Sequence, residues 1–206
     1  MDAKKAVEQL KYLEKLAPKN MRLAAEWNER WKILISTIMS SQSRDETTIK
    51  IAEELFKNYN GLNELANAKY EKVLKILKSL NYNKTKARHI IETAGILIEK
   101  YGKKIPENIK ELLELPGVGR KVANVYLVEA CNAEAIGVDT HVARISRKLG
   151  WAKSKNPHKI EKELQALFPR RYWNSINYIL VRFGRSVDRK EEDEVIMKMK
   201  RKIYKY

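Results

Sequence analysis

The sequence predicts an all-α fold. Glycine and proline, the residues that most weaken helices, number only 8 and 5 in 206 residues, while Leu, Lys, Glu, Ile and Ala, which mostly favour helices, are plentiful. Apolar residues recur at helical spacing, and no stretch shows the sustained alternation of a half-buried strand. Since about ten short helices do not surround one core compactly, we expect two helical lobes with a cleft between them.

The first half of the chain contains six predicted helices. Val7, Leu10, Leu13 and Leu16 form an apolar stripe that Pro18 ends. The segment Ser43-Arg44-Asp45-Glu46 has the form of a capping box, in which Ser43 caps a helix running to about Tyr59. The remaining predictions are a buried helix over 27–39, short helices over 62–66 and 70–78, and a longer one over 84–101.

The second half continues in the same way. Pro106 fits the first turn of a helix that ends near Glu114. Asp139 is placed to cap a helix to Leu149, and Asn156-Pro157 opens the next one. The last predicted helices cover 120–130, 172–183 and 191–204.

Charge and cysteine content limit the function. Lys plus Arg number 42 and Asp plus Glu 26, so the net charge is +16, which predicts a polyanionic partner, either nucleic acid or an anionic membrane surface. No apolar run reaches the roughly 18 residues of a membrane span, and no signal peptide is visible, so we expect a soluble cytoplasmic protein with no membrane partner. The single cysteine, Cys131, excludes an intramolecular disulfide, a four-cysteine zinc site and an iron–sulfur cluster.

Two glycines lie close together in Leu115-Pro116-Gly117-Val118-Gly119-Arg120-Lys121, between two predicted helices. Such a turn exposes backbone amides at the start of the second helix, where the helix dipole favours a phosphate. The spacing fits neither a Walker loop nor a dinucleotide-binding motif. An ordinary glycine-capped connection explains the glycines equally well, but the net charge favours a phosphate site.

These residues resemble a known family. The segment from Leu115 to Asn124 resembles the helix-hairpin-helix of the endonuclease III family of DNA glycosylases, and Val138-Asp139-Thr140-His141-Val142-Ala143-Arg144 resembles its catalytic-aspartate segment, 18 residues after Lys121. Residues 38–45 are similar to its Ser-x-Gln-x-x-Asp segment, and 82–90 to its Lys-Ala loop and helix. The resemblance runs from about Trp31 to Arg185.

The resemblance implies a six-helix barrel over roughly 20–130 and a second lobe from 1–19 and 131–206, with DNA across the cleft and the damaged nucleotide flipped into it. Lys121 matches the nucleophile, which attacks the deoxyribose C1′ and forms a Schiff base. Asp139 matches the carboxylate that assists it. Taken alone, this residue is better explained as a helix cap, and the two roles are compatible.

The resemblance also implies DNA contacts. Gln42 would fill the gap left by the extruded nucleotide, and Tyr82 would wedge into the opposite strand unless it is a half-buried aromatic. His141 would touch a phosphate or cap its helix. The other matched positions are Gly117, Val118, Gly119, Arg120 and Thr140, and hairpins of this family can hold a monovalent cation through backbone carbonyls.

The chain departs from the family at its end. Most members carry a four-cysteine iron–sulfur loop that would start after Phe183-Gly184-Arg185, and here Asp188 stands where the first cysteine belongs. The sequence therefore predicts a cluster-free relative with no metal site. A helix with a basic end replaces the loop, and it is either a solvated face or a set of phosphate contacts: Lys198, Lys200, Arg201, Lys202 and Lys205.

The residues at positions 37 and 121 limit which damaged base we expect the protein to excise. Adenine-excising relatives lack the lysine and carry a glutamate where Thr37 stands, and mismatch glycosylases typically have tyrosine in place of Lys121. We therefore predict a bifunctional glycosylase and abasic-site lyase for oxidised pyrimidines, a nucleoid-associated monomer acting on damaged double-stranded DNA. The alternatives are specificity for uracil or 8-oxoguanine, or a non-catalytic helix-hairpin-helix module.

Overall fold

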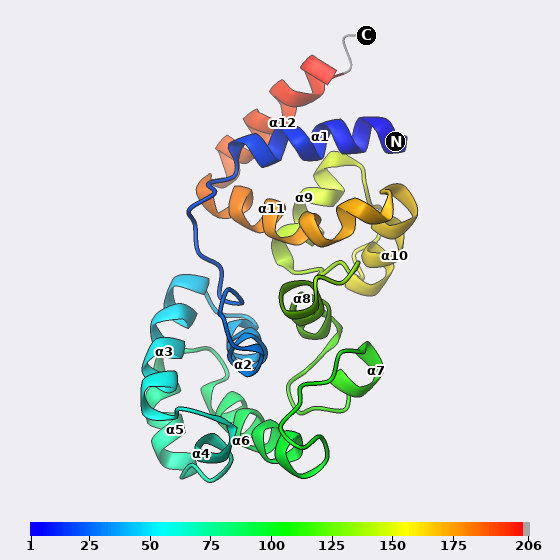
Figure 1. Ribbon diagram of the computed structural model, residues 1–206. Helices are drawn as coiled ribbons and strands as arrows, with labels where there is room; N and C mark the ends of the chain where they lie inside the picture. The colour runs from blue at the N-terminus through cyan, green and yellow to red at the C-terminus, as the bar shows by residue number, and fades with distance from the viewer. Residues whose placement is uncertain (204–206) are drawn as a thin grey trace. The chain divides into compact units, whose positions relative to one another are not determined.

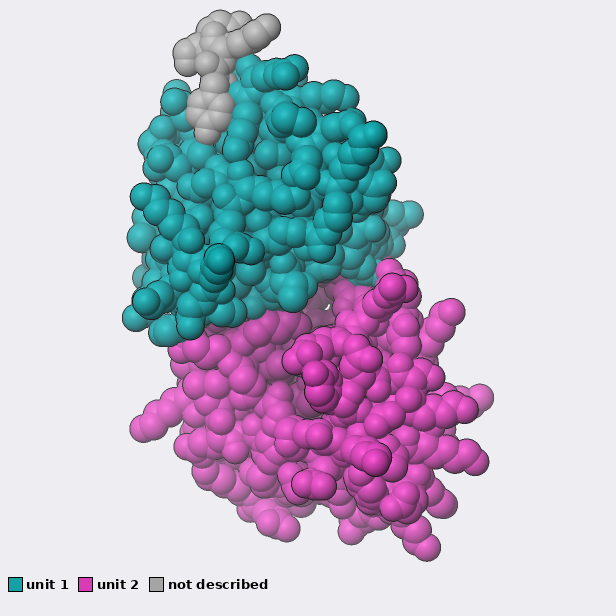
Figure 2. Space-filling model, turned by 180° about the vertical axis from the view of Figure 1, so that it is seen from behind, with its two compact units in different colours: residues 1–21, 133–206 teal, residues 22–132 magenta. Residues whose placement is uncertain are grey.

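A computed structural model describes residues 1–203, which form twelve α-helices and two 3₁₀ helices and contain no strand. The all-α prediction is therefore confirmed. The chain divides into two compact units, Arg22–Asn132 and Met1–Met21 with Ala133–Tyr206 (Figure 2). These boundaries lie two residues from the expected ones at 20 and 130. Within the described residues, no helix has the length and hydropathy to cross a bilayer.

The first of these units, residues 22–132, is built around a buried helix, α2 (Arg30–Ser40), in which every residue from Ile33 to Ser40 is buried. Helices α8, α3 and α6 pack against it. The helices of this unit after α2 are (Figure 1): α3 (Asp45–Asn58), α4 (Leu62–Ala66), α5 (Tyr70–Ile76), a 3₁₀ turn (Leu77–Ser79), α6 (Asn83–Glu99), α7 (Ile109–Leu112) and α8 (Arg120–Cys131).

Three predicted helix starts in this unit are wrong. Helix α3 begins at Asp45 after Arg44, with no side-chain cap, because the Ser43 hydroxyl instead accepts a hydrogen bond from the backbone N–H of Asn81. Pro106 precedes α7, which starts later because the Asn108 side chain accepts from the Glu111 amide at 3.0 Å and caps it. The helix expected from residue 27 begins at Arg30.

The other unit packs five helices on one core (Figure 1): α1 (Ala3–Leu16), α9 (Thr140–Leu149), α10 (Pro157–Leu167), α11 (Trp173–Ser186) and α12 (Arg189–Ile203). Leu10 of α1, Ile145 of α9, Leu180 of α11 and Met199 of α12 are almost fully buried in it. The predicted caps are confirmed: Asp139 caps α9, and Asn156 caps α10 with Pro157 in the first turn.

Helix α12 is joined to α9 by a buried carboxylate. Glu192, only 1% exposed, binds Arg144 at 2.7 Å and Lys148 at 2.8 Å. We call these three residues the Glu192 cluster. In addition, the Lys200 ammonium donates to the Lys148 carbonyl at the end of α9. Of the basic residues at the end of α12, Lys200 therefore has a structural role, while Lys198, Arg201 and Lys202 are exposed; Tyr204 and Lys205 lie outside the described residues.

The residues present do not fit an iron–sulfur cluster. Cys131, the one cysteine of the sequence, ends α8 in the unit that does not contain α12. Burial raises the pKa of its thiol, which disfavours the thiolate that iron would need. The segment after Arg185 instead forms α12, with Asp188 accepting hydrogen bonds from the Lys190 and Glu191 amides at its start.

Candidate functional site

The glycine hairpin lies between α7 and α8, and its turn is fixed against α6 and α2. Gly117 has φ +77°, and a Cβ there would lie 2.9 Å from His89 Nδ1 and 3.0 Å from Ile38 Cγ2. The hydroxyl of Thr93 donates to the Pro116 carbonyl at 2.9 Å. Gly117 is therefore required both by its backbone conformation and by close packing.

Gly119 differs from Gly117, because a Cβ at this position would meet nothing within 4 Å. It is exposed and forms the N-cap of α8, which has no side-chain cap. Arg120 is exposed beside it. Val118, by contrast, is buried, and its N–H donates to the Leu115 carbonyl at 3.1 Å. The start of α8 thus presents backbone and positive charge outward, while Val118 supports the turn from inside.

Lys121 lies in the first turn of α8 and is partly exposed. Its ammonium donates to the hydroxyl of Ser40, the last residue of α2, at 3.4 Å. A second ammonium, that of Lys86 on α6, donates to the carbonyl of Met39 at 2.6 Å. Two lysines therefore meet the C-terminal end of α2, where the helix dipole favours cations.

Lys86 is a residue of the candidate site that the sequence motifs did not single out. It is 5% exposed, and burial, followed by the charge of Lys121, lowers its pKa to about 8. The signal was its place in the Lys-Ala segment. Nothing in that pattern distinguishes a buried lysine from the solvated ones around it.

Gln42 and Tyr82 are exposed residues with left-handed backbones, at φ 54° and φ 56°. Tyr82 is 65% exposed, so the half-buried alternative is wrong. The loops that carry them are joined, because the Asn81 side-chain amide donates to the Gln42 carbonyl at 2.6 Å. The structure thus brings together the two residues for which the resemblance implied insertion into DNA.

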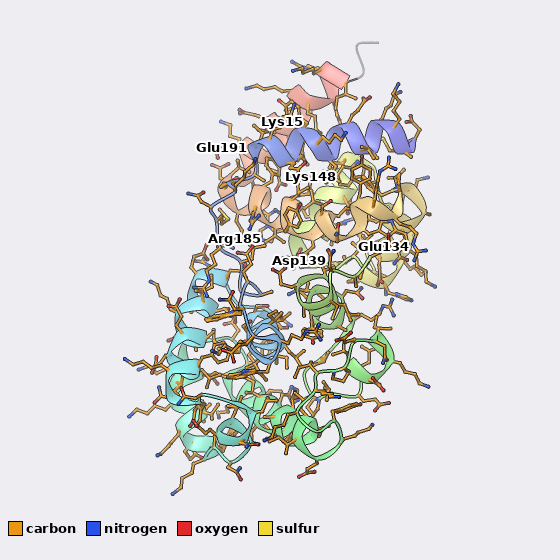
Figure 3. The ribbon with its side chains drawn as sticks, in the orientation of Figure 1. Lys15, Glu134, Asp139, Lys148, Arg185 and Glu191 are labelled. Carbon is orange, nitrogen blue, oxygen red and sulfur yellow. The ribbon has the colours of Figure 1, made fainter. Side chains whose placement is uncertain are left out.

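In the other unit, Asp139 precedes α9 and is partly exposed. Its Oδ1 accepts from the Val142 amide at 2.8 Å. Figure 3 places Asp139 and Arg185 toward the same edge of this unit, with Lys148 farther from that edge. Asp139 thus lies in the unit formed by residues 1–21 and 133–206, whereas Lys121 lies in the unit formed by residues 22–132.

The two residues after Asp139 differ. Thr140 is exposed, whereas His141 is packed against α11, since a Cβ on Gly184 would lie 2.6 Å from His141 Nδ1. That nitrogen lies 3.2 Å from Arg144 Nη2. Within residues 1–203, no group of three or more His, Cys, Asp or Glu side chains could hold a metal ion.

Comparison with known proteins agrees with this arrangement. Residues 35–170 match the family model described as HhH-GPD superfamily base excision DNA repair protein. Endonuclease III of Thermotoga maritima is 44% identical over 157 residues, 76% of this chain and 74% of its own length. Endonuclease III of Synechocystis is 34% identical over 184 residues, 89% and 84% of the two lengths.

Solved structures show the same fold. A trapped endonuclease III–DNA covalent intermediate superposes with a TM-score of 0.84 at 29% identity, covering 90% of this chain and 87% of its own. A thermostable thymine-DNA glycosylase, at 21% identity and a TM-score of 0.78, shares the fold. The chain belongs to the HhH-GPD superfamily of base excision DNA repair proteins, and within it to the endonuclease III family.

Proposed function

We propose that this chain excises oxidised pyrimidines from duplex DNA and cleaves the resulting abasic site, with Lys121 as the nucleophile. Its family makes it a bifunctional DNA glycosylase and abasic-site lyase. The observation that supports the assignment to Lys121 is its position. It stands in the first turn of the helix that follows the glycine hairpin, partly exposed and hydrogen-bonded to Ser40 at the end of α2.

The reaction requires the neutral amine of Lys121. Its nitrogen lone pair attacks C1′, the bond from C1′ to the base breaks, and the base leaves with the electron pair and takes up a proton. Opening of the sugar ring gives an imine between C1′ and Nζ. Loss of a C2′ proton then expels the 3′ phosphate, so that the strand is cut on the 3′ side, and water hydrolyses the imine to release the enzyme.

Asp139 assists as a carboxylate. Positive charge develops on the sugar as the base departs, and a fixed negative group stabilises it. The same group can accept a proton from the attacking amine. One oxygen of Asp139 already accepts the Val142 amide, so the helix cap also fixes the orientation of the carboxylate.

The partner is damaged double-stranded DNA. Gly117, Gly119 and Arg120 at the hairpin, and Thr140 and His141 beside Asp139, are proposed to contact its backbone, with Val118 contributing only through its carbonyl because its N–H is already used. Gln42 and Tyr82 would occupy the space of the extruded nucleotide and the opposite strand. The net charge of +16 favours such a polyanion.

Borohydride trapping on abasic-site duplex tests the proposal. The wild type should give a covalent adduct, and Lys121→Ala should give none while it still binds the duplex. Absence of a wild-type adduct would overturn the lyase assignment and favour a non-catalytic module. A panel of defined lesions then separates oxidised pyrimidines from uracil, 8-oxoguanine and adenine. Adenine is the base that we expect the protein to reject, because Thr37 stands where adenine-excising relatives carry a glutamate. The buried Thr37 hydroxyl donates to the Ile33 carbonyl, so this position supplies no carboxylate.

We also propose that the protein acts as a monomer without an iron–sulfur cluster. Iron analysis and sedimentation of the active protein test both points. A monovalent cation at the hairpin carbonyls is the one cofactor that we propose, and exchange of potassium for lithium, with the DNA affinity as readout, tests it.

A further inference from the structure

Two exposed residues of the site have a backbone conformation that residues other than glycine rarely adopt. Gln42 follows the end of α2 and Tyr82 precedes α6, and both are left-handed. A residue stays in this region only when its surroundings hold it there, and such residues concentrate at sites of function. The contacts that hold these two loops therefore determine whether the pair is preformed before DNA arrives.

The contacts form one connected network. The Ser43 hydroxyl accepts from the Asn81 backbone N–H at 3.2 Å and from Lys86 Nζ at 2.9 Å. Lys86 Nζ also donates to the Met39 carbonyl at 2.6 Å, and the Asn81 side chain donates to the Gln42 carbonyl at 2.6 Å. We call Met39, Ser43, Asn81 and Lys86 the Lys86 network; it links the end of α2, the Gln42 loop and the Tyr82 loop.

Lys86 is the charged member of this network, and its ammonium is buried. It is 5% exposed, and a buried ammonium is unfavourable unless its protons are hydrogen-bonded. The end of α2 supplies a carbonyl and a favourable dipole, and Ser43 supplies a hydroxyl. A methionine of similar length would fill the space, but it would leave the Met39 carbonyl and Ser43 without this donor.

We propose that Lys86 is a positioning residue that locks the Gln42 and Tyr82 loops together as a preformed wedge, and so promotes extrusion of the damaged nucleotide. Loops that are already ordered in the free protein do not have to lose conformational entropy when DNA binds. Lys86 touches neither the base nor the sugar in this role. The inference rests on the proposed function, since it assigns the wedge to the same reaction.

The test compares two substrates under single-turnover conditions with saturating enzyme. The first is an oxidised pyrimidine paired in a duplex, whose base must be extruded. The second is an abasic site in an unpaired bulge, which has no base to extrude and still reports on Lys121 through strand cleavage and borohydride trapping. The variants are Lys86→Met and Ser43→Ala, and the control is Lys84→Met, which removes an exposed charge near the start of the same helix.

Lys86→Met and Ser43→Ala should slow duplex excision by roughly ten- to hundredfold, as expected for misplaced positioning groups. Ser43→Ala, which leaves the Lys86 charge in place, should retain the wild-type rate on the bulged abasic site. Lys86→Met should lose much less on that substrate than on the duplex, and Lys84→Met should retain both rates. If Lys86→Met does not fold, Ser43→Ala, which removes one hydroxyl, carries the test.

Two results would overturn the inference. An equal loss on both substrates would place Lys86 at the reaction centre, and an unchanged duplex rate would show that the loops are ordered without it. Failure of the proposed function is distinct, because the wild type itself would then fail on the oxidised pyrimidine, if its base specificity is different, or on both substrates, if it is not a lyase.

Discussion

Arg144 binds the carboxylate of Glu192 through two nitrogens. Its Nε lies 3.1 Å and 3.2 Å from the two carboxylate oxygens, and Nη2 lies 2.7 Å from one of them. The arrangement joins α12 to α9, whose first residue follows Asp139. Helix α12, in the segment where the family resemblance led us to expect a cluster loop, is thus connected to the helix that the proposed catalytic carboxylate caps.

Glu192→Gln should destabilise the unit that contains it. The change leaves Arg144 and Lys148, at 16% and 29% exposure, without their buried counter-charge, and the expected loss in free energy of unfolding is about 3 kcal/mol. Urea denaturation measures it. The matched control is Asp193→Asn, since Asp193 also binds Lys148 but is 56% exposed, and it should cost less than about 1 kcal/mol. Equal effects would show that burial of Glu192 is unimportant.

Asp139→Asn and Asp139→Ala should separate the cap from the chemistry. Asparagine can still accept the Val142 amide, so the stability should be retained, whereas alanine should cost about 1 kcal/mol. Both should slow base excision by roughly 10²–10⁴-fold, because neither supplies a carboxylate. Thermal unfolding and single-turnover rates provide the two readouts. An active Asp139→Asn protein would reduce Asp139 to a helix cap.

Lys86 should make stability depend on pH in a defined window. Its folded pKa of about 8 lies below the ordinary value of 10.5, so the unfolded chain binds more protons between these values and stability rises with pH there. Urea midpoints at pH 7 and pH 9.5 measure the rise. Lys86→Met should reduce the difference between the two midpoints, and an unchanged difference would assign the pH dependence to other groups.

Binding of undamaged duplex should weaken steeply with salt. The slope of log affinity against log salt should be about −0.9 for each phosphate neutralised. Arg120→Ala at the hairpin should reduce its magnitude by about one, uniformly across sequences. Lys57→Ala, an exposed charge in the last turn of α3, is the control and should leave the slope unchanged. A flat wild-type dependence would contradict backbone binding.

Local sequence rules predicted the elements well where one residue decides the outcome. Asp139 and Asn156 cap their helices through hydrogen bonds to amides two or three residues farther along the chain, which local spacing is enough to specify. The same rule failed at Ser43, whose hydroxyl is used by Asn81 and Lys86, 38 and 43 residues farther along the chain. A capping rule contains no information on such distant partners.

The candidate site shows the same limit. The motif segments pointed to Lys121 and Gln42 because their neighbours in sequence are distinctive. Lys86 and Glu192 are important only because they are buried, at 5% and 1% exposure, and burial of a charge depends on tertiary packing. Among 42 basic and 26 acidic residues, composition and spacing do not identify the few that lie inside.

The Glu192 cluster has a consequence for the effect of temperature. The penalty for removing charged groups from water falls as temperature rises, because their hydration becomes less favourable. The ion pairs of Glu192 with Arg144 and Lys148 therefore contribute more to the free energy of unfolding as the temperature rises, whereas the contribution of apolar burial levels off. The contact between α9 and α12 should thus stabilise the protein more at high temperature than at low temperature. The loss in free energy of unfolding caused by Glu192→Gln should therefore increase as the temperature is raised.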